Sequence, residues 1–323
     1  MLLRRLVSAF LDDVRATNFR GASARFMRSL RALRFPAQSN RVLKLLDERR
    51  ADLRLSERDL FFHLHHHHYL SRGFTPQQRI ESLLAHYQFE ATRYLPSFRG
   101  QVYGGQGLVL WQSTLNGTDF RIRLIPGNEV RWRWEGELSA VLSVNGVTLT
   151  VMSFSYVNAS VFGLSPGPIL FITRNQSFRE AEPQLLFRST FKQTTPPYFC
   201  LAALSGLAHT NGMRGMAAIR HDAHISQDRD NEEHLKNSYT EFWNSFHATE
   251  LGGPALLLPV PMAMRPLSDV PAKHRTRARV RREAWAQVTA SASAAIRRHQ
   301  SERTQLSHYL SGVYMLLVPL LGV

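Results

Sequence analysis

Apolar residues recur at helical spacing in residues 1–95 of the chain. Near the N-terminus they lie three or four positions apart, as one face of an amphipathic helix requires. These positions are Leu3, Leu6, Phe10, Leu11 and Val14. The helical pattern continues through 25–34, and Pro36 is expected to stop the run.

The segment 56–95 has helix-starting signals of its own. Ser56 and Asp59 fit a capping box, and Thr75-Pro76 predicts the start of a further helix. The glycine-rich segment Gly100–Gly107 then marks a boundary, because glycine disfavours the interior of a helix.

From residue 108 the pattern changes from helical spacing to alternation, which predicts strands. The expected strands are 108–111, 120–125, 138–144 and 147–156, with Asn145-Gly146 as the turn of a hairpin. A short apolar strand at 169–172, a helix at about 197–211 and a strand at 216–219 are expected to follow.

This order of elements predicts an α+β fold, with a helical N-terminal region followed by a mixed, mainly antiparallel sheet and packed helices. No internal repeat is present. The expected divisions are a basic helical extension at 1–50, a helical subdomain at 51–100, an α+β core at 101–272, and a basic helix with an apolar tail at 273–323.

Charge is the unusual feature of the composition. The chain has 40 basic and 25 acidic residues and a formal net charge of +15. Nearly all of the basic residues are arginines, since the lysines are only Lys44, Lys192, Lys236 and Lys273. Such a balance suits an anionic lipid or another phosphate-bearing partner, or it reflects an arginine-rich solvated surface.

Several classes of protein are excluded or disfavoured. The single cysteine, Cys200, rules out an intrachain disulfide and a cysteine-based zinc site, and its apolar neighbours predict an unreactive thiol. Asp12 and Asp13 interrupt the apolar N-terminus, so we expect a helix there instead of a secretory signal. No apolar window is long enough to span a bilayer, and Pro319 breaks the apolar C-terminus.

Two motifs suggest ligands that the rest of the sequence does not support. The histidine tract at 63–68 lacks the spacing of a metalloprotease site, so no metal is predicted. Asn211–Gly215 is glycine-rich but has no Walker lysine and follows a helix, so we interpret it as a helix end and a turn. The sequence names no cofactor.

The titratable groups placed for acid–base chemistry are few. His221 and His224 follow a predicted strand, where ligand sites of α/β proteins gather. Glu135 and Glu137 are the carboxylate candidates, and His86-Tyr87 lies on a predicted helix.

A basic helix is predicted from Thr276 to His299, within the basic segment 273–303. It can lie on an anionic membrane, bind nucleic acid or form a solvated face. Because aromatic residues are sparse and no nucleic-acid-binding motif is present, contact with a membrane surface is the preferred functional interpretation and nucleic acid is disfavoured.

An ordered set of short segments resembles the VirK/YbjX family of bacterial proteins. The set includes Glu135–Leu138, Phe154–Tyr156, Ile169–Gln176, Gly206–Ile219, Tyr239–Trp243 and Lys273–Arg277. The resemblance implies a role in virulence, envelope integrity and tolerance of antimicrobial peptides, with no established reaction. The strand–helix–strand middle is also similar to an acyl-N-acyltransferase core, which is an analogy of fold alone.

The chain departs from the family pattern at one loop. Where that pattern has two glycines, in Ile-Gly-x-x-Gln-Gly, this chain has Thr173 and Ser177. The stretch from Lys192 to Pro197 is also altered. A pocket that depends on these glycines would be changed in this member.

Together these features predict a cytoplasmic protein, peripheral at the inner membrane, that acts at or near the envelope. Whether it is an enzyme is left open. If it is one, acyl transfer is the expected reaction, with Glu137, His221 and His224 as the catalytic candidates. The residues expected to bind the ligand are His86, Tyr87, Gln176, Tyr239, Trp243, Arg275 and Arg277. The alternatives are an accessory protein that binds anionic lipid or a partner through its arginine-rich helix and, more weakly, a nucleic-acid binder.

Overall fold

The computed structural model describes residues 2–16, 18–53, 69–130, 135–192, 194–226 and 231–301. The predicted cap at Ser56 and the histidine tract at 63–68 lie outside these residues.

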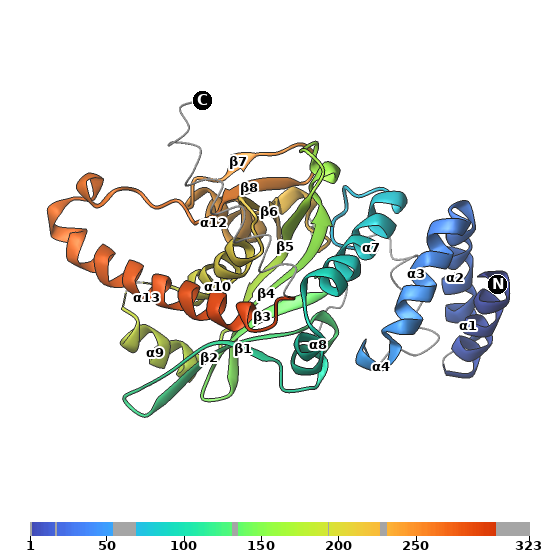
Figure 1. Cartoon of the computed structure of the whole chain (residues 1–323), viewed down its shortest axis with the longest axis horizontal. Coiled ribbons are helices and arrows are strands. Elements are labelled where there is room, and N and C mark those ends of the chain that lie inside the picture. The colour runs from blue at the N-terminus through green and yellow to red at the C-terminus, as the bar shows by residue number, and fades with distance from the viewer. Residues whose placement is uncertain are drawn as a thin grey trace.

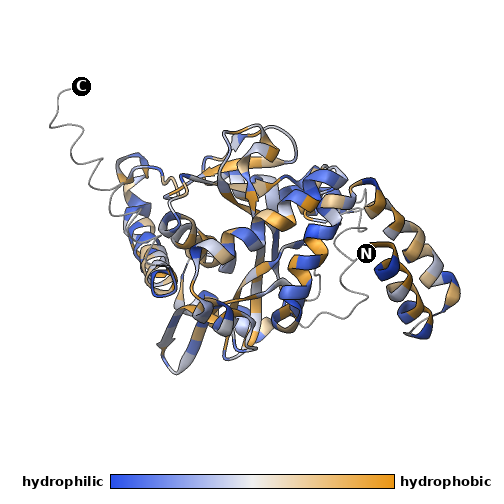
Figure 2. Cartoon of the chain, turned by 45° about the vertical axis from the view of Figure 1, so that its right-hand side comes forward, coloured by the Kyte–Doolittle hydropathy of each residue, from blue (hydrophilic) through white to orange (hydrophobic). Residues whose placement is uncertain are grey.

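The N-terminal region is helical, as predicted. Its elements are α1 (Leu2–Ala16), α2 (Phe19–Ser29), a 3-10 helix (Leu30–Arg34), α3 (Pro36–Glu48) and α4 (Arg50–Leu53). The predicted face of α1 is wrong in part, because Leu3 and Leu11 are exposed while Leu2 and Leu6 are buried. Contacts with α2 and α3 cover only a narrow stripe of α1. Figure 2 shows both hydrophobic and hydrophilic stretches on the helices near the N-terminus.

Helix α7 (Pro76–Arg93) connects this region to the sheet. Thr75 caps its start as predicted: the hydroxyl accepts from the N–H of Gln78, and the Gln78 side chain accepts from the N–H of Thr75. Helix α3 packs on α7, and α7 packs against β4. Helix α8 (Pro96–Tyr103) ends inside the predicted glycine-rich boundary. In Figure 1 the helices α1 to α4 lie beyond α7, away from the sheet.

The described chain forms one eight-stranded sheet in the order β1-β2-β3-β4-β5-β6-β8-β7. Its strands are β1 (Leu108–Leu115), β2 (Thr118–Pro126), β3 (Leu138–Val144), β4 (Val147–Asn158), β5 (Pro168–Ser177), β6 (Gly215–Ile219), β7 (Thr249–Glu250) and β8 (Ala255–Pro259). Only β5 and β6 pair in parallel, and the other neighbours are antiparallel. The predicted α+β class and mixed sheet are confirmed. Strands β7 and β8 were not predicted.

The remaining helices are α9 (Ala181–Thr190), α10 (Pro196–Thr210), α11 (Glu232–Lys236), α12 (Phe242–Asn244) and α13 (Ala272–Arg297). Helix α10 packs against β3, β4 and β5, and α13 covers α10 (Figure 1). Gly206 permits this approach, because a Cβ there would lie 2.4 Å from the carbonyl oxygen of Thr289. None of the described helices is long and apolar enough to cross a bilayer.

Candidate functional site

Strands β5 and β6 separate partway along β5. They are paired only where Leu170 to Ile172 face β6, although β5 continues to Ser177. A π-helical turn (Asn237–Glu241) lies beside the remainder of β5. There the backbone N–H of Asn175 donates to the Tyr239 hydroxyl at 3.1 Å, and the Asn175 side-chain amide donates to the Ser238 carbonyl at 2.9 Å.

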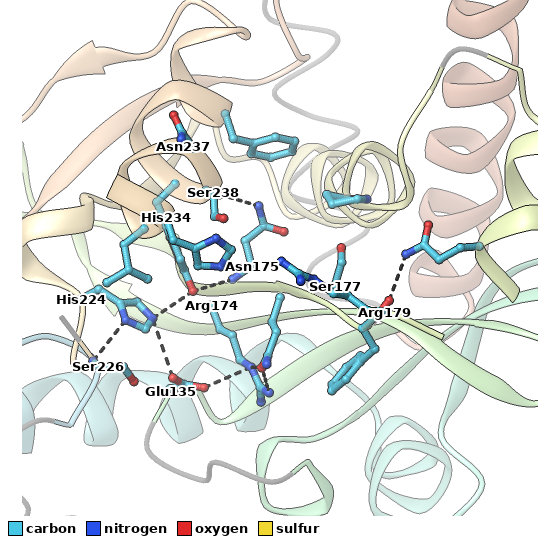
Figure 3. A pocket seen from close by; sticks show the side chains of 17 residues that line it. Glu135, Arg174, Asn175, Ser177, Arg179, His224, Ser226, His234, Asn237 and Ser238 are labelled. Atoms are coloured by element: carbon cyan, nitrogen blue, oxygen red, sulfur yellow. Dashed lines mark hydrogen bonds and ion pairs between the residues drawn. The ribbon is translucent and has the colours of Figure 1, made fainter. Parts of the chain in front are cut away.

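A pocket of about 480 Å³ opens at this separation. Four of the titratable side chains in its lining lie close to one another: Glu135 from the residues before β3, Arg174 from β5, His224 from the segment after β6, and Tyr239 from the π-helical turn. Figure 3 shows Glu135, Arg174 and His224 around the pocket. The site therefore lies past the carboxyl end of β6 and beside the carboxyl-terminal part of β5, near the place where ligands of α/β sheets bind.

His224 is neutral at pH 7 and carries its proton on one identifiable nitrogen. Burial, with Arg174 and Arg72 nearby, lowers the pKa of His224 to about 4. The Nδ1 atom accepts from the backbone N–H of Ser226 at 3.2 Å, so the ring proton is on Nε2. This Nε2 lies 2.9 Å from the Tyr239 hydroxyl oxygen.

The Tyr239 hydroxyl group is placed to donate a hydrogen bond to a ligand. Its oxygen accepts from the Asn175 N–H, and a protonated His224 Nε2 can only donate to it. Among the described residues nothing accepts the Tyr239 proton. Burial raises the pKa of Tyr239, so the hydroxyl stays protonated and can donate to a ligand in the pocket.

Glu135 is a buried carboxyl group of the pocket with a raised pKa. Burial raises its pKa to about 7, although the Arg174 guanidinium opposes this shift. The Arg174 Nε lies 3.1 Å from Glu135 Oε2, and the His224 Nε2 lies 3.7 Å from Glu135 Oε1. Glu135 is therefore suited to exchange a proton near neutral pH.

The walls hold these groups in place. Arg174 donates from Nε and Nη2 to the side-chain oxygen of Gln176. The hydroxyl of Thr173 donates to the carbonyl oxygen of Glu135. Thr173 therefore forms part of the support for Glu135.

Glu137, a catalytic candidate from the sequence, belongs to a separate buried network. Its two carboxylate oxygens accept from the hydroxyls of Tyr69 at 2.6 Å and Tyr87 at 2.5 Å. Its backbone N–H donates to the hydroxyl of Ser155. Glu137 lines none of the pocket described above.

His86 also lies in buried structure, next to Glu90. Its Nδ1 accepts from the N–H of Tyr156 at 3.1 Å, and its Nε2 lies 3.4 Å from Glu90. Arg49 and Tyr103 donate to the Glu90 carboxylate at 2.7 and 2.9 Å. These bonds tie the N-terminal helices to the sheet, as buried charges require partners.

The other predicted residues are dispersed. Trp243 is fully buried and donates its indole N–H to the Ile219 carbonyl at 2.9 Å. His221 lies outside the pocket, with Nδ1 2.8 Å from the Thr240 hydroxyl. Arg275 and Arg277 are exposed on α13, where Arg275 donates to the Val270 carbonyl. The pocket thus unites only Gln176, His224 and Tyr239 from the predicted set, together with Glu135.

The part of the chain that the structure describes has no group of three or more His, Cys, Asp or Glu side chains that could hold a metal ion. Cys200 is buried, and burial raises the pKa of its thiol to about 12, in agreement with the predicted lack of reactivity.

Comparison with known families shows which family the chain belongs to. The family model described as "Protein of unknown function (DUF535)" matches residues 17–294. The chain belongs to the DUF535 family. No curated protein and no solved structure matches it. The DUF535 match includes the whole pocket and both buried networks, so the site lies within the family's own region.

Sequence reasoning missed Arg174, whose charge opposes the raised pKa of Glu135 in the DUF535 pocket. A signal was present, because the charged Arg174 follows the apolar run Ile169–Ile172 closely within the same strand. A buried charge of that kind requires a partner, and only tertiary structure identified it as Glu135.

Proposed function

We propose that this DUF535 protein is of the VirK/YbjX type and that its pocket catalyses acyl transfer, with Glu135 as the general base and Tyr239 as the general acid. The observation that carries the proposal is the meeting of a carboxyl group of pKa about 7 and an available tyrosine hydroxyl at one neutral histidine, His224. The family resemblance supports a role in envelope integrity and tolerance of antimicrobial peptides.

The reaction requires two proton transfers, one from the acceptor to a base and one from an acid to the leaving group. An amine or hydroxyl acceptor would attack the acyl carbonyl, form the new C–N or C–O bond and lose a proton to Glu135. The bond from the acyl carbon to the leaving group would break, and Tyr239 would donate its proton to that group. Arg174 holds Glu135 in position and keeps part of its population ionised near neutrality.

The fold supports the same class of reaction. Strand β5, helix α10 and the parallel strand β6 form the strand–helix–strand unit that the acyltransferase analogy requires. One feature limits the donor. Pro196 and Pro197 occupy the start of α10 and have no N–H, so this helix end is a poor phosphate site. We therefore propose a donor that is held mainly through its acyl group.

The test is the release of free thiol from acetyl and palmitoyl thioesters by the purified chain, with and without a small amine acceptor. Glu135→Gln is expected to lower turnover by about 10²–10⁴-fold, the usual contribution of a general base. Tyr239→Phe should also lower it. Glu182→Gln, which changes an exposed glutamate of α9, is the matched control and should leave the rate unchanged. Wild-type protein inactive on every donor, or full activity in Glu135→Gln, would refute the proposal.

A second candidate function rests on α13. Lys273, Arg275, Arg277 and Arg279 are all exposed in its first turns, and no acidic residue lies in the first turn. Positive charge at a helix N-terminus opposes the helix dipole, and an anionic surface would relieve this repulsion. The alternative is therefore an accessory protein that binds anionic lipid through α13, at the inner membrane.

Sedimentation with vesicles tests this alternative. Replacing Arg275, Arg277 and Arg279 with glutamine should abolish binding to anionic vesicles. Replacing Arg20, Arg188 and Arg214, exposed arginines at other places, makes the same change in net charge and should have little effect. Equal losses in the two triple variants would indicate attraction by net charge alone.

A further inference from the structure

A second pocket, of about 360 Å³, lies between α13 and the segment 263–271 that precedes it. It shares no lining residue with the first pocket. Its walls are Tyr198 of α10, residues 245–247 after α12, residues 263–265, 270 and 271, and Arg281, Arg282 and Trp285 of α13.

The lining is basic. Arg265, Arg281, Arg282 and His247 contribute to it, and none of the lining residues in the described chain is acidic. Guanidinium groups that share a small pocket repel one another, and the repulsion is strongest where solvent is partly excluded. An anion bound between them would remove this cost.

The two helix arginines are held in position by their surroundings. The Arg281 guanidinium carbon lies 5.2 Å from the centroid of the Trp285 ring. Trp285 in turn stacks on Tyr198, with the ring centroids 4.9 Å apart and an angle of 17° between the planes. Arg282 donates to the carbonyl oxygen of Arg265, which joins α13 to the loop. Such preorganised guanidinium groups lose less conformational freedom when they bind phosphate.

The rest of the wall is apolar. Phe246 is buried beneath the pocket, and Met264 keeps 38% of its surface exposed at the rim. Val270 and Pro271 complete this side. The pocket therefore offers a basic part for a charged group and an apolar part for the body that carries it, the arrangement of a small-molecule site.

We propose that this pocket binds a phosphate monoester whose phosphate contacts Arg281 and Arg282 and whose apolar group packs on Phe246 and Met264. The chemistry is shared by a soluble aryl phosphate and by the head group of phosphatidic acid. The site is independent of the acyl-transfer proposal, because it uses none of the same residues.

Calorimetric titration of the full chain with phenyl phosphate tests the proposal, with inorganic phosphate as the probe without an apolar group. Phenyl phosphate should bind more tightly than inorganic phosphate. Arg281→Gln combined with Arg282→Gln should weaken it at least tenfold, as the loss of charge-assisted bonds predicts. Arg277→Gln combined with Arg279→Gln, an equal change in charge on exposed positions of the same helix, should alter it less than twofold.

A second variant keeps the proposal testable if the double arginine variant does not fold. Met264→Glu places a carboxylate at the partly exposed rim and should abolish phenyl phosphate binding while the thermal unfolding temperature is kept. Equal weakening in the two arginine pairs, or absence of binding to wild type, would overturn the proposal. Vesicles containing phosphatidic acid separate the two sources. Loss of vesicle binding in the Arg281 and Arg282 variant, with binding kept when the exposed Arg188 and Arg214 are both replaced by glutamine, identifies a lipid head group. Retention of vesicle binding in the Arg281 and Arg282 variant identifies a soluble ester.

Discussion

Glu135 and Glu137 are two residues apart, yet their carboxylates belong to different networks. Glu135 contacts Arg174 and lies near His224 in the pocket, whereas Glu137 accepts from Tyr69 and Tyr87 inside the protein. Gly136 joins them with a φ of 143°, and a Cβ there would lie 2.7 Å from the backbone nitrogen of Phe154. Glu137 thus anchors the segment that presents Glu135.

Gly136→Ala is expected to destabilise the fold by at least about 2 kcal/mol, because it adds both a clash with backbone and an unfavourable φ. Chemical denaturation measures the change. Gly146→Ala is the matched control, since Gly146 also has a positive φ but has open space around it. It should cost only about 1 kcal/mol. Similar values for the two variants would show that the contact with Phe154 is unimportant.

Removing the anchor should lower stability without removing the acid–base group. Tyr69→Phe and Tyr87→Phe each delete a hydrogen bond to the buried Glu137 carboxylate, and each should cost about 1.5–3 kcal/mol. Urea unfolding of the single and double variants gives the values. The two losses should not be additive, because both bonds end on one carboxylate; strict additivity would argue against a shared anchor.

Glu135 should make the protein less stable as the pH rises. The folded pKa of about 7 lies above the ordinary value of 4.5, so the folded state binds the extra proton between these limits. Its favourable contribution is complete below pH 4.5 and is lost as the pH rises through 7. The stability of Glu135→Gln relative to wild type should therefore rise by about 3 kcal/mol from acidic to alkaline buffer. A constant difference across this range would contradict the assignment.

His224 should have the opposite effect. Its folded pKa of about 4 lies below the ordinary 6.5, so its contribution is complete above pH 6.5 and is lost as the pH falls toward 4. His224→Gln should be relatively more stable in acid than wild type. The ring signals of His224 in an NMR titration provide an independent check, and a midpoint near 6.5 would refute burial as the cause.

Trp243→Phe should destabilise the π-helical turn that carries Tyr239. The indole N–H holds the turn after Tyr239 to the Ile219 carbonyl of β6, and phenylalanine cannot replace that bond. A loss of about 1–3 kcal/mol is expected for the unsatisfied carbonyl and the smaller ring. Relative to wild type, the variant should exchange its amide hydrogens faster in residues 237–241, while exchange in α7 should stay the same. Unchanged exchange in the π-helical turn would exclude this role.

Periodicity in the sequence determined most of the elements and the fold class. Alternation predicted β3 and most of β4, Asn145-Gly146 predicted their hairpin, and the Thr75 cap predicted the start of α7. These features depend on neighbours within a few residues, so local sequence carries them. Strand β8 was missed because its apolar run is short and its pairing with β6 is not local.

The site was only partly predictable for the same physical reason. Gln176, His224 and Tyr239 were named from the strand end and the family segments, but their contacts join residues far apart in the chain. Glu135 and Glu137 have the same residue type and nearly the same position, and sequence alone could not separate them. Tertiary structure decided that one is buried beside a guanidinium and a neutral histidine and the other between two tyrosine hydroxyls, because burial and partners, which set protonation, arise only when distant segments pack together.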